Sequence, residues 1–295
     1  MPDLTAIGLG EILWDVLPDR STLGGAPANF AYHVNALGGT GVPLSRIGDD
    51  KLGRQTLDAL LAKNVSTRHL SLDPDHPTGT VLAKLDPEGV ATYTFPDNVA
   101  WDFLAPTPDD LLLAARADII CFGTLAQRSP ASRQAVRTVL RHAPQALKIF
   151  DANLRQHFWD SATLRTSLAL ADVLKLNDAE LDTLTTLFCL PQNPRAAMET
   201  LLHRYDLKLA VLTRGPHGSL VLSPQNASDL PGQPTPVADT IGAGDAFTAA
   251  MALAYLHGQS TDQINRYAAN VAANVCAMPG AMPDMPRELR IDAQG

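Results

Sequence analysis

Short apolar runs alternate with longer segments of helical period along most of this chain. Residues 117–123 (ADIICFG) are only long enough for a buried strand, whereas residues 130–142 (PASRQAVRTVLRH) repeat their apolar positions with the period of a helix. Strands that alternate with helices build βαβ units, whose parallel sheet is covered by helices on both faces. The pattern therefore predicts an α/β fold with a mostly parallel sheet.

The same pattern assigns an element to each segment in turn. Strands are predicted at residues 4–10, 42–48, 117–123, 147–153, 172–177 and 209–215. Helices are predicted at residues 27–39, 50–64, 130–142, 163–171, 179–188, 194–205 and 248–258.

One region interrupts this alternation. Residues 77–103 (PTGTVLAKLDPEGVATYTFPDNVAWDF) carry two β-rich arms around the turn sequence DPEG, without a helical period. An antiparallel insertion in a parallel α/β chain is a candidate lid or dimerisation flap. An ordinary edge hairpin explains the same pattern, and the sequence alone leaves both explanations open. The C-terminal tract PGAMPDMPRELRIDAQG is rich in proline and is expected to be irregular.

Composition and charge exclude several classes of protein. Of the 295 residues, 45% are hydrophobic and 18% are charged, which is enough apolar material for a sizeable core. The formal net charge is −8, and the scattered Lys and Arg residues form no basic face for a nucleic acid. Three distant cysteines suit reduced thiols. With neither a signal peptide nor a membrane span in the pattern, we expect a cytoplasmic protein without nucleic-acid or membrane partners.

Residues 239–247 (DTIGAGDAF) place two glycines and a carboxylate at the start of a helix. A turn before a helix explains them, because glycine allows unusual backbone angles and the helix dipole favours an acidic first turn. The alternative is an anion cradle, in which the N–H groups of Gly242, Ala243 and Gly244 hold a phosphoryl group. Asp245 would then face a hydroxyl that loses its proton while attacking phosphorus. An anion cradle beside an acidic base is the arrangement of a kinase.

Two further segments place polar residues after predicted strands. Asn177 and Glu180 in LKLNDAEL have the spacing of a capping box, which explains them without a ligand. The same side chains on one helix face also suit a hydrated Mg²⁺ and nucleotide phosphates. Arg155 in FDANLRQHFW follows a strand at the edge where open α/β sheets collect ligands, although a solvated loop explains that segment equally well.

The N-terminal segment holds candidates for a polyol site. Asp15 stands between apolar neighbours in ILWDVLPDR, ahead of Gly24, Gly25 and Asn29. A carboxylate and an amide near glycines suit bidentate hydrogen bonding to sugar hydroxyls. A turn that leads into a helix is the competing explanation.

Several common catalytic motifs are missing from the sequence. The segment GLGEIL has Leu13 where the dinucleotide-binding fingerprint needs its third glycine, which argues against a dehydrogenase. GxxxxGK[ST], HExxH and GxSxG do not occur, and the histidines form no metal-spaced group.

Taken together, these motifs resemble the ribokinase-type (PfkB) family of carbohydrate kinases. GGAPANFAYHVNALGG and DTIGAGDAF are similar to the family's two signature segments, and RIGDDKLG, DANLR, LKLNDAEL and LTRGPHGSL lie between them in the family's order. The resemblance covers nearly the whole chain. It implies one ribokinase-like domain over residues 1–295, with a doubly wound, mostly parallel sheet flanked by helices. It also implies a small β-strand lid, formed here from about residues 11–24 and 77–103.

The resemblance further implies ATP and Mg²⁺ as cofactors, leaves a K⁺ requirement open, and suggests a homodimer that forms through the lid. The catalytic residues it implies are Asp245 as general base, Gly242, Ala243 and Gly244 as anion hole, and Arg155 beside the transferred phosphate or the sugar. The implied sugar contacts are Asp15, Gly25, Asn29, Asn98 and Asp245. The implied nucleotide contacts are Asn177, Thr213, Gly215, Gly242, Gly244 and Asn270, with Glu180 near Mg²⁺ through water. The loop that follows Asn270 is one residue shorter than is usual in the family.

The choice of sugar depends on charge. Within the family, GEILWDVLP and DANLR look most like fructokinases and 2-keto-3-deoxygluconate kinases. An acid sugar needs a cation for its carboxylate. Related lids often carry an aromatic–Arg pair where this chain has Pro96 and Asp97, and Asp97 would repel a carboxylate. We therefore expect a neutral ketohexose, with fructose as the first candidate.

Other acceptors and another class of protein stay open at this point. A 2-keto-3-deoxygluconate kinase, or another sugar or nucleoside kinase of the family, is the first alternative. A sugar- or nucleotide-binding regulator without catalysis is the second. The intact Asp245 beside a complete GAG sequence argues for the enzyme.

Overall fold

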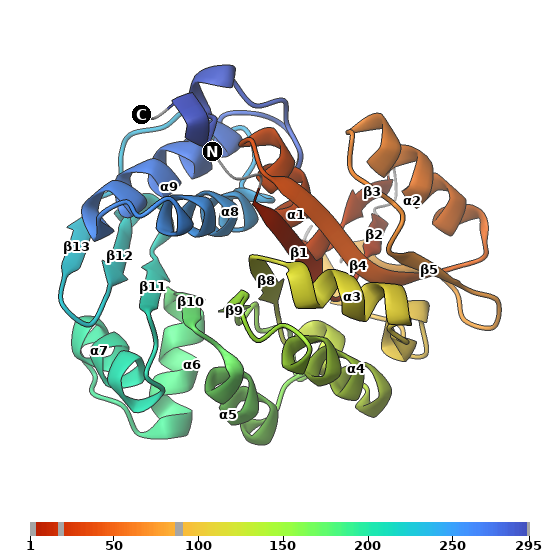
Figure 1. Cartoon of the computed structure of the whole chain (residues 1–295), viewed down its shortest axis with the longest axis horizontal. Helices are drawn as coiled ribbons and strands as arrows, with labels where there is room; N and C mark the ends of the chain where they lie inside the picture. Colours follow the sequence, from red (N-terminus) through yellow and green to blue (C-terminus); the bar gives the residue numbers. More distant parts are fainter. Residues whose placement is uncertain (1–3, 17–20, 86–90, 294–295) are drawn as a thin grey trace.

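The computed structural model describes residues 4–16, 21–85 and 91–293. Its centre is a nine-stranded sheet in which the seven strands from β11 to β5 are parallel, and β12 and β13 are antiparallel (Figure 1). From one edge to the other, the strands are β13 (Ala227–Leu230), β12 (Ser219–Leu222), β11 (Leu209–Thr213), β10 (Val173–Asn177), β9 (Leu147–Asp151), β8 (Ile119–Phe122), β1 (Thr5–Leu9), β4 (Thr40–Gly48) and β5 (Leu70–Asp73). The predicted mostly parallel α/β sheet is confirmed.

Helices cover both faces of this sheet. One apolar cluster joins the sheet to the third through seventh helices, and a second cluster joins its other face to the first, eighth and ninth. The helices are α1 (Ala26–Ala36), α2 (Lys51–Ala62), α3 (Pro108–Arg116), α4 (Pro130–Arg141), α5 (Ser161–Leu170), α6 (Asp178–Phe188), α7 (Pro194–Arg204), α8 (Ala243–Leu256) and α9 (Thr261–Cys276). Because both faces are buried, strands such as β8, with the sequence IICF, are apolar throughout.

Polar side chains cap the start of several of these helices, of which α2, α4 and α5 were predicted and α9 was not. The side chains of Asp50, Ser129, Asp160 and Ser260 each accept a hydrogen bond from a backbone N–H of the first turn of α2, α4, α5 and α9, respectively. These four polar residues therefore act as N-caps.

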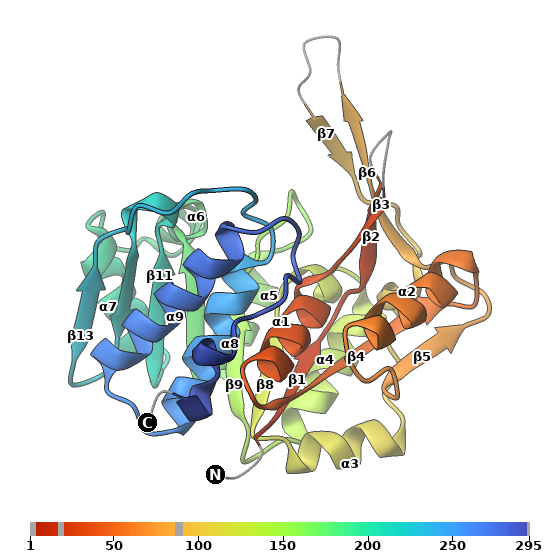
Figure 2. The same cartoon turned by 90° about the horizontal axis from the view of Figure 1, so that it is seen from above.

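A second, four-stranded sheet stands apart from the first (Figure 2). Its strands are, in order, β3 (Ser21–Gly24), β2 (Leu13–Val16), β6 (Gly79–Leu85) and β7 (Ala91–Thr94). The predicted antiparallel arms of residues 77–103 are β6 and β7, and the DPEG turn lies outside the described residues. The family resemblance already grouped residues 11–24 and 77–103 into one small β element, but it did not predict that β2 pairs with β6 in parallel.

The C-terminal tract is irregular, as predicted, apart from two short 3₁₀ turns at Arg287–Leu289 and Ile291–Ala293. Leu289 and Ile291 are buried against the sheet face that carries α8 and α9. All three cysteines lie in the described part of the chain and are unpaired. Among the described residues, no helix is long and apolar enough to cross a membrane.

Candidate active site

The strand order of the main sheet creates a place for a ligand. From β1, the chain continues to β4 on one side and later to β8 on the other, so β1 and β8 flank a topological switch point. Ligands of open α/β sheets bind outside the carboxyl ends of the strands at such a point. Helix α8 begins at this edge, and its first residues are the GAGD sequence.

The start of α8 has an open backbone that side chains do not cover. Gly242 is the N-cap in the left-handed region (φ 80°), and no side chain accepts from the N–H groups of the first turn. A Cβ on Gly242 would lie 2.5 Å from the carbonyl oxygen of Ala281, so this position requires glycine for its angles and for its neighbour. The Ala243 N–H makes only a long backbone hydrogen bond of 3.4 Å to the Thr240 carbonyl. N–H groups at a helix start that no side chain caps can bind an anion, so the predicted cradle of Gly242, Ala243 and Gly244 stays a prediction that this geometry allows.

Asp245 lies in the first turn of α8 and is held from α1. Its Oδ2 accepts a hydrogen bond of 2.8 Å from Nδ2 of Asn29. Burial and the nearby Asp151 carboxylate raise the pKa of Asp245 to about 6, against the opposing effect of the Asn29 hydrogen bond and the charges of Lys175 and Arg155. The carboxylate is therefore ionised at neutral pH and a better proton acceptor than an exposed aspartate.

Helix α1 also presents an unused polar atom beside Asp245. Asn29 is buried, and its Oδ1 has no hydrogen-bond partner among the described residues. A buried amide oxygen without a donor is costly, and a ligand hydroxyl could satisfy it. Gly25 caps this helix with a φ of 111°, and a Cβ there would lie 2.5 Å from the carbonyl oxygen of Glu11.

Asp15 is placed on β2 of the second sheet. It is half-buried, and burial raises the pKa of its carboxyl, against the favourable charge of Arg155. A Cβ on Gly24 would lie 2.7 Å from Asp15 Oδ2, so the glycine leaves room for that carboxylate. The Arg155 side chain is exposed in the loop after β9, and its charge also acts on the carboxyls of Asp245 and Glu11.

Glu11 is a site residue that the sequence interpretation missed. It follows β1 at the switch point and is buried, and burial raises its pKa to about 7. The charge of Asp245 contributes to this increase, whereas backbone N–H groups and Arg155 oppose it. Its position directly after the first strand was the available signal, but the sequence context suggested only a fragment of a dinucleotide motif.

A buried ion pair was also missed. Lys175 on β10 donates to both oxygens of Asp151 at the end of β9, over 3.0 and 3.1 Å. Thr248 of α8 donates to Asp151 Oδ2 over 3.0 Å. The pair thus connects two strand ends with the helix that carries Asp245.

Asn177 and Glu180 form the capping box that the sequence allowed. Asn177 Oδ1 accepts from the Glu180 N–H, and Glu180 Oε2 accepts from the Asn177 N–H, both over 2.9 Å. Glu180 Oε1 additionally accepts from the Leu154 N–H over 3.0 Å. Burial raises the Glu180 pKa, against the lowering effect of Lys175. Within the described ranges, no group of three or more His, Cys, Asp or Glu could enclose a metal ion.

The predicted nucleotide contacts lie toward the other half of the same sheet edge. Thr213 ends β11, next to Asn177 in the parallel register, and its hydroxyl donates to the Leu176 carbonyl. Gly215 follows with a φ of 51° and open space around its Cα. Asn270 is exposed on α9.

Asn98 lies in the loop after β7, exposed and in the left-handed region (φ 57°). Within the described part of the chain, no hydrogen bond joins it to Asp245 or Asn29. The loop is held by Arg128, which donates to the Pro96 carbonyl over 2.5 Å and to both oxygens of the Asp102 carboxylate. The structure therefore joins Asn29 directly to Asp245, whereas Asn98 lies exposed in the loop after β7.

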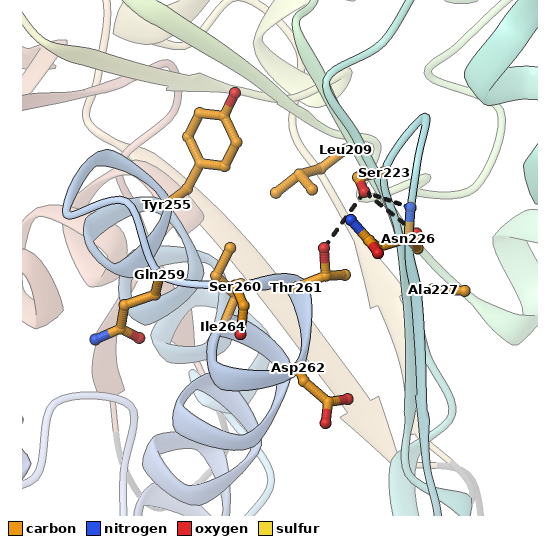
Figure 3. Close-up of a pocket in the computed structure, with 10 residues that line it drawn as sticks. All are labelled: Leu209, Ser223, Asn226, Ala227, Tyr255, Gln259, Ser260, Thr261, Asp262 and Ile264. Carbon is orange, nitrogen blue, oxygen red and sulfur yellow. Dashed lines mark hydrogen bonds between the residues drawn. The ribbon is translucent and has the colours of Figure 1, made fainter.

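A hollow of about 420 Å³ lies at the amino end of β11, away from the carboxyl ends of the parallel strands (Figure 3). It is formed around Leu209 at the start of β11, the turn at Ser223 and Asn226, and the α8–α9 connection at Tyr255 and Thr261. The hollow includes Tyr255 near the end of α8, whereas Asp245 lies in the first turn of the same helix, so the two places are at opposite ends of α8. It contains none of the predicted site residues.

Comparisons with known proteins show which family the sequence resembles. A model described as pfkB family carbohydrate kinase matches residues 18–288. The chain is 31% identical over 306 residues to a fructokinase of Salmonella typhimurium, covering 97% of each chain.

Solved structures show the same fold. A fructokinase from Vibrio cholerae O395, in a form with bound fructose, ADP and calcium ion, superposes with a TM-score of 0.79 at 25% identity, covering 95% of this chain and 94% of that one. An uncharacterized sugar kinase from Pyrococcus horikoshii in complex with ATP superposes with a TM-score of 0.77 at 27% identity, over the same shares of the two chains.

Proposed function

The chain belongs to the pfkB family of carbohydrate kinases and is a phosphotransferase with an alcohol group as acceptor. We propose that it transfers the γ-phosphoryl group of ATP to a hydroxyl of a neutral ketohexose, with fructose as the first candidate. The observation that carries the proposal is the pairing of Asp245 with the open N-terminus of α8. An ionised base and an anion site then lie within one helical turn.

In this proposal Asp245 is the general base. Asn29 binds Oδ2, which leaves Oδ1 as the carboxylate oxygen to face the acceptor hydroxyl. Phosphoryl transfer is largely dissociative, so the hydroxyl loses its proton late and a base with a pKa of about 6 is sufficient. The N–H groups of Gly242, Ala243 and Gly244 stabilise the charge on the phosphoryl oxygens. Arg155 adds a cation beside the transferred phosphate or the sugar.

For the nucleotide we propose Asn177, Thr213, Gly215 and Asn270 as contacts. Mg²⁺, when bound, neutralises charge on the phosphates. Each Glu180 oxygen accepts one backbone hydrogen bond and so keeps a lone pair for a water of the hydrated ion. Mg²⁺ usually keeps several waters and takes few protein carboxylates, which fits a single acidic side chain.

Charge favours a neutral acceptor. The proposed sugar contacts Asp15 and Asp245 are acidic, and Glu11 adds a third carboxyl behind them. Arg128, which lies just before α4 and holds the loop after β7, is already neutralised by Asp102. Arg155 is thus the cation on which an acid sugar would depend. The relative from Vibrio cholerae, which carries fructose, supports fructose as the first candidate.

We also propose that the sheet of β2, β3, β6 and β7 is the lid over the sugar. It contributes Asp15 directly, and its β6–β7 arm extends away from the main sheet (Figure 2). Pairing of two such sheets would give a homodimer. Asn98 is the proposed sugar contact from the loop that follows β7.

The test is ADP release with Mg–ATP across fructose, 2-keto-3-deoxygluconate, ribose, glucose, fructose 6-phosphate and adenosine, each with Na⁺ alone and with added K⁺. We expect the highest kcat/KM with fructose. A preference for the acid sugar would mean that Arg155 holds its carboxylate and would overturn the choice of a neutral sugar. Binding of ATP with no turnover of any acceptor would instead support a regulator.

A further inference from the structure

Lys175 is a buried cation beneath the start of α8 that the proposed mechanism does not yet use. It alternates with the apolar Leu174 and Leu176, which pack on the opposite face of the sheet, so its side chain faces α8 together with Val173. Its side chain is only 9% exposed. A buried ammonium requires compensation, and Asp151 supplies it.

A side chain at Gly242 and one at Gly244 would meet different neighbours. At Gly242, a Cβ would meet the backbone of Ala281. At Gly244, the nearest atom to a Cβ is Nζ of Lys175, at 3.1 Å. The space beside Gly244 is therefore filled by an ammonium group and not by another part of the backbone.

The position of this ammonium is electrostatically unusual. The N-terminus of a helix carries partial positive charge, so a cation there is unfavourable unless anions are close. Asp151 is the direct partner, and Glu180 and Asp245 are the further carboxylates that raise the Lys175 pKa. Lys175 also has three N–H donors, two of which are directed to Asp151. An anion bound in the cradle would further compensate the positive charges of Lys175 and of the helix N-terminus.

We propose that Lys175, held in place by Asp151, is the fixed cation of the anion cradle and stabilises the phosphoryl group electrostatically during transfer. This inference rests on the proposed kinase function and extends it to a side chain outside the signature segments. Asp151 is the positioning residue, because it orients the ammonium beneath Gly244 and binds Thr248 of α8.

The test compares the binding of ADP alone with that of ADP plus aluminium fluoride, a mimic of the phosphoryl group in transfer, by calorimetry with Mg²⁺ and fructose present. We expect Lys175→Met to weaken binding of the mimic about 100-fold more than binding of ADP alone. Lys148→Met, on the neighbouring strand β9, is the matched control and should leave both affinities unchanged. Lys175→Arg keeps the charge and should retain most of the difference.

The double variant Lys175→Met with Asp151→Asn separates an electrostatic from a structural role. It removes both charges, so no buried carboxylate is left unpaired, and it remains informative even if the single variant fails to fold. We expect it to fold and still to bind the mimic weakly. Binding of the mimic as tightly as in the unsubstituted protein would overturn the role of Lys175 alone. If the unsubstituted protein neither tightens on the mimic nor phosphorylates any sugar, the kinase function itself fails.

Discussion

Asp245 is the proposed general base, and its neighbours have opposing effects on the pKa of its carboxyl group. Burial and Asp151 favour its protonated form, whereas Asn29, Lys175 and Arg155 favour the ionised form. The balance gives a pKa of about 6, low enough for ionisation at neutral pH. A general base is most effective when its pKa lies near the working pH.

The pH dependence of catalysis should report this group. We expect kcat/KM for the sugar, at saturating Mg–ATP, to fall about tenfold per pH unit below a pH of about 6, because protonated Asp245 cannot accept the hydroxyl proton. Steady-state rates between pH 5 and 8 give the profile. A profile that stays flat across this range would remove Asp245 as the titrating base.

The same group should make the protein less stable when it ionises. Its pKa of about 6 in the folded state lies above the ordinary 3.8, so the native state binds the proton more tightly than the unfolded chain. The stability contributed by protonation is complete below pH 3.8 and is lost as the pH rises through about 6. Asp245→Asn should therefore raise Tm by a few degrees at pH 8 and by less at pH 5. A Tm that falls equally at both pH values would contradict the assignment.

At this scale the sequence predicted residues in recognisable motifs and missed those defined by packing. Asp245 and Asn29 were both predicted, and the structure joins them by a hydrogen bond between positions 216 residues apart. Glu11 and Lys175 were not predicted, because a single Glu after a strand and a single Lys within one have no local signature. Their significance comes from burial and from partners on other elements.

Helix α8 is the element that turns these side chains into a site. Its start is shaped by Gly242, whose left-handed backbone lets the chain turn while the 277–285 connection packs behind it. Helix α1 supports the same connection, since Tyr32 donates to the Pro283 carbonyl and His33 Nε2 bonds to that of Ala281. Burial lowers the His33 pKa to about 4, so the ring is neutral at physiological pH and donates from Nε2.

A pair of glycine substitutions should separate backbone strain from contact. Gly242→Ala places a Cβ against Ala281 in addition to straining the left-handed backbone, whereas Gly258→Ala, at φ 72° after α8, meets no atom within 4 Å. The left-handed conformation alone costs an alanine roughly 1–2 kcal/mol. We expect Gly258→Ala to lower Tm slightly and retain activity, and Gly242→Ala to lower Tm more and abolish turnover. Thermal melts and ADP release give the comparison, and equal effects at both positions would contradict it.

Elements with a strong local pattern were predicted well. The amphipathic segment at residues 130–142 became α4, and the apolar run at 117–123 became β8. The pairing between β2 and β6 was not predicted, because it joins positions 66 residues apart, such as Leu13 and Gly79, and register between distant strands leaves no local signal. Strands β5, β12 and β13 and helices α3 and α9 were also not predicted.

At the scale of the whole molecule, the topology divides the site into two halves. The second sheet and α1 bring Asp15 and Asn29 to one side of Asp245, whereas β10 and β11 bring Asn177 and Thr213 to the other. The switch point between β1 and β8 lies between these halves. We therefore propose that the sugar and the nucleotide bind to different elements.

If the two substrates bind to different elements, replacing a side chain on the sugar side should weaken binding of the sugar without changing binding of ATP. Asp15→Asn should raise KM for fructose about tenfold or more and leave the Kd for ATP unchanged, because a hydrogen-bonding carboxylate is lost only on the sugar side. Asp58→Asn, an exposed position on α2, is the control and should change neither. Titrations of each substrate at saturation of the other provide the values. An unchanged KM for fructose would move the sugar site away from the second sheet.

The most direct test of the account is the effect of Asp245→Asn on turnover and on ATP binding in the same preparation. Asp262→Asn, in the first turn of α9, is the matched control. The account predicts that kcat with fructose falls by about 10²- to 10⁴-fold while the calorimetric Kd for ATP is retained, since only the proton acceptor is lost. Turnover close to that of the unsubstituted protein would contradict the assignment of Asp245 as the base and, with it, the site proposed here.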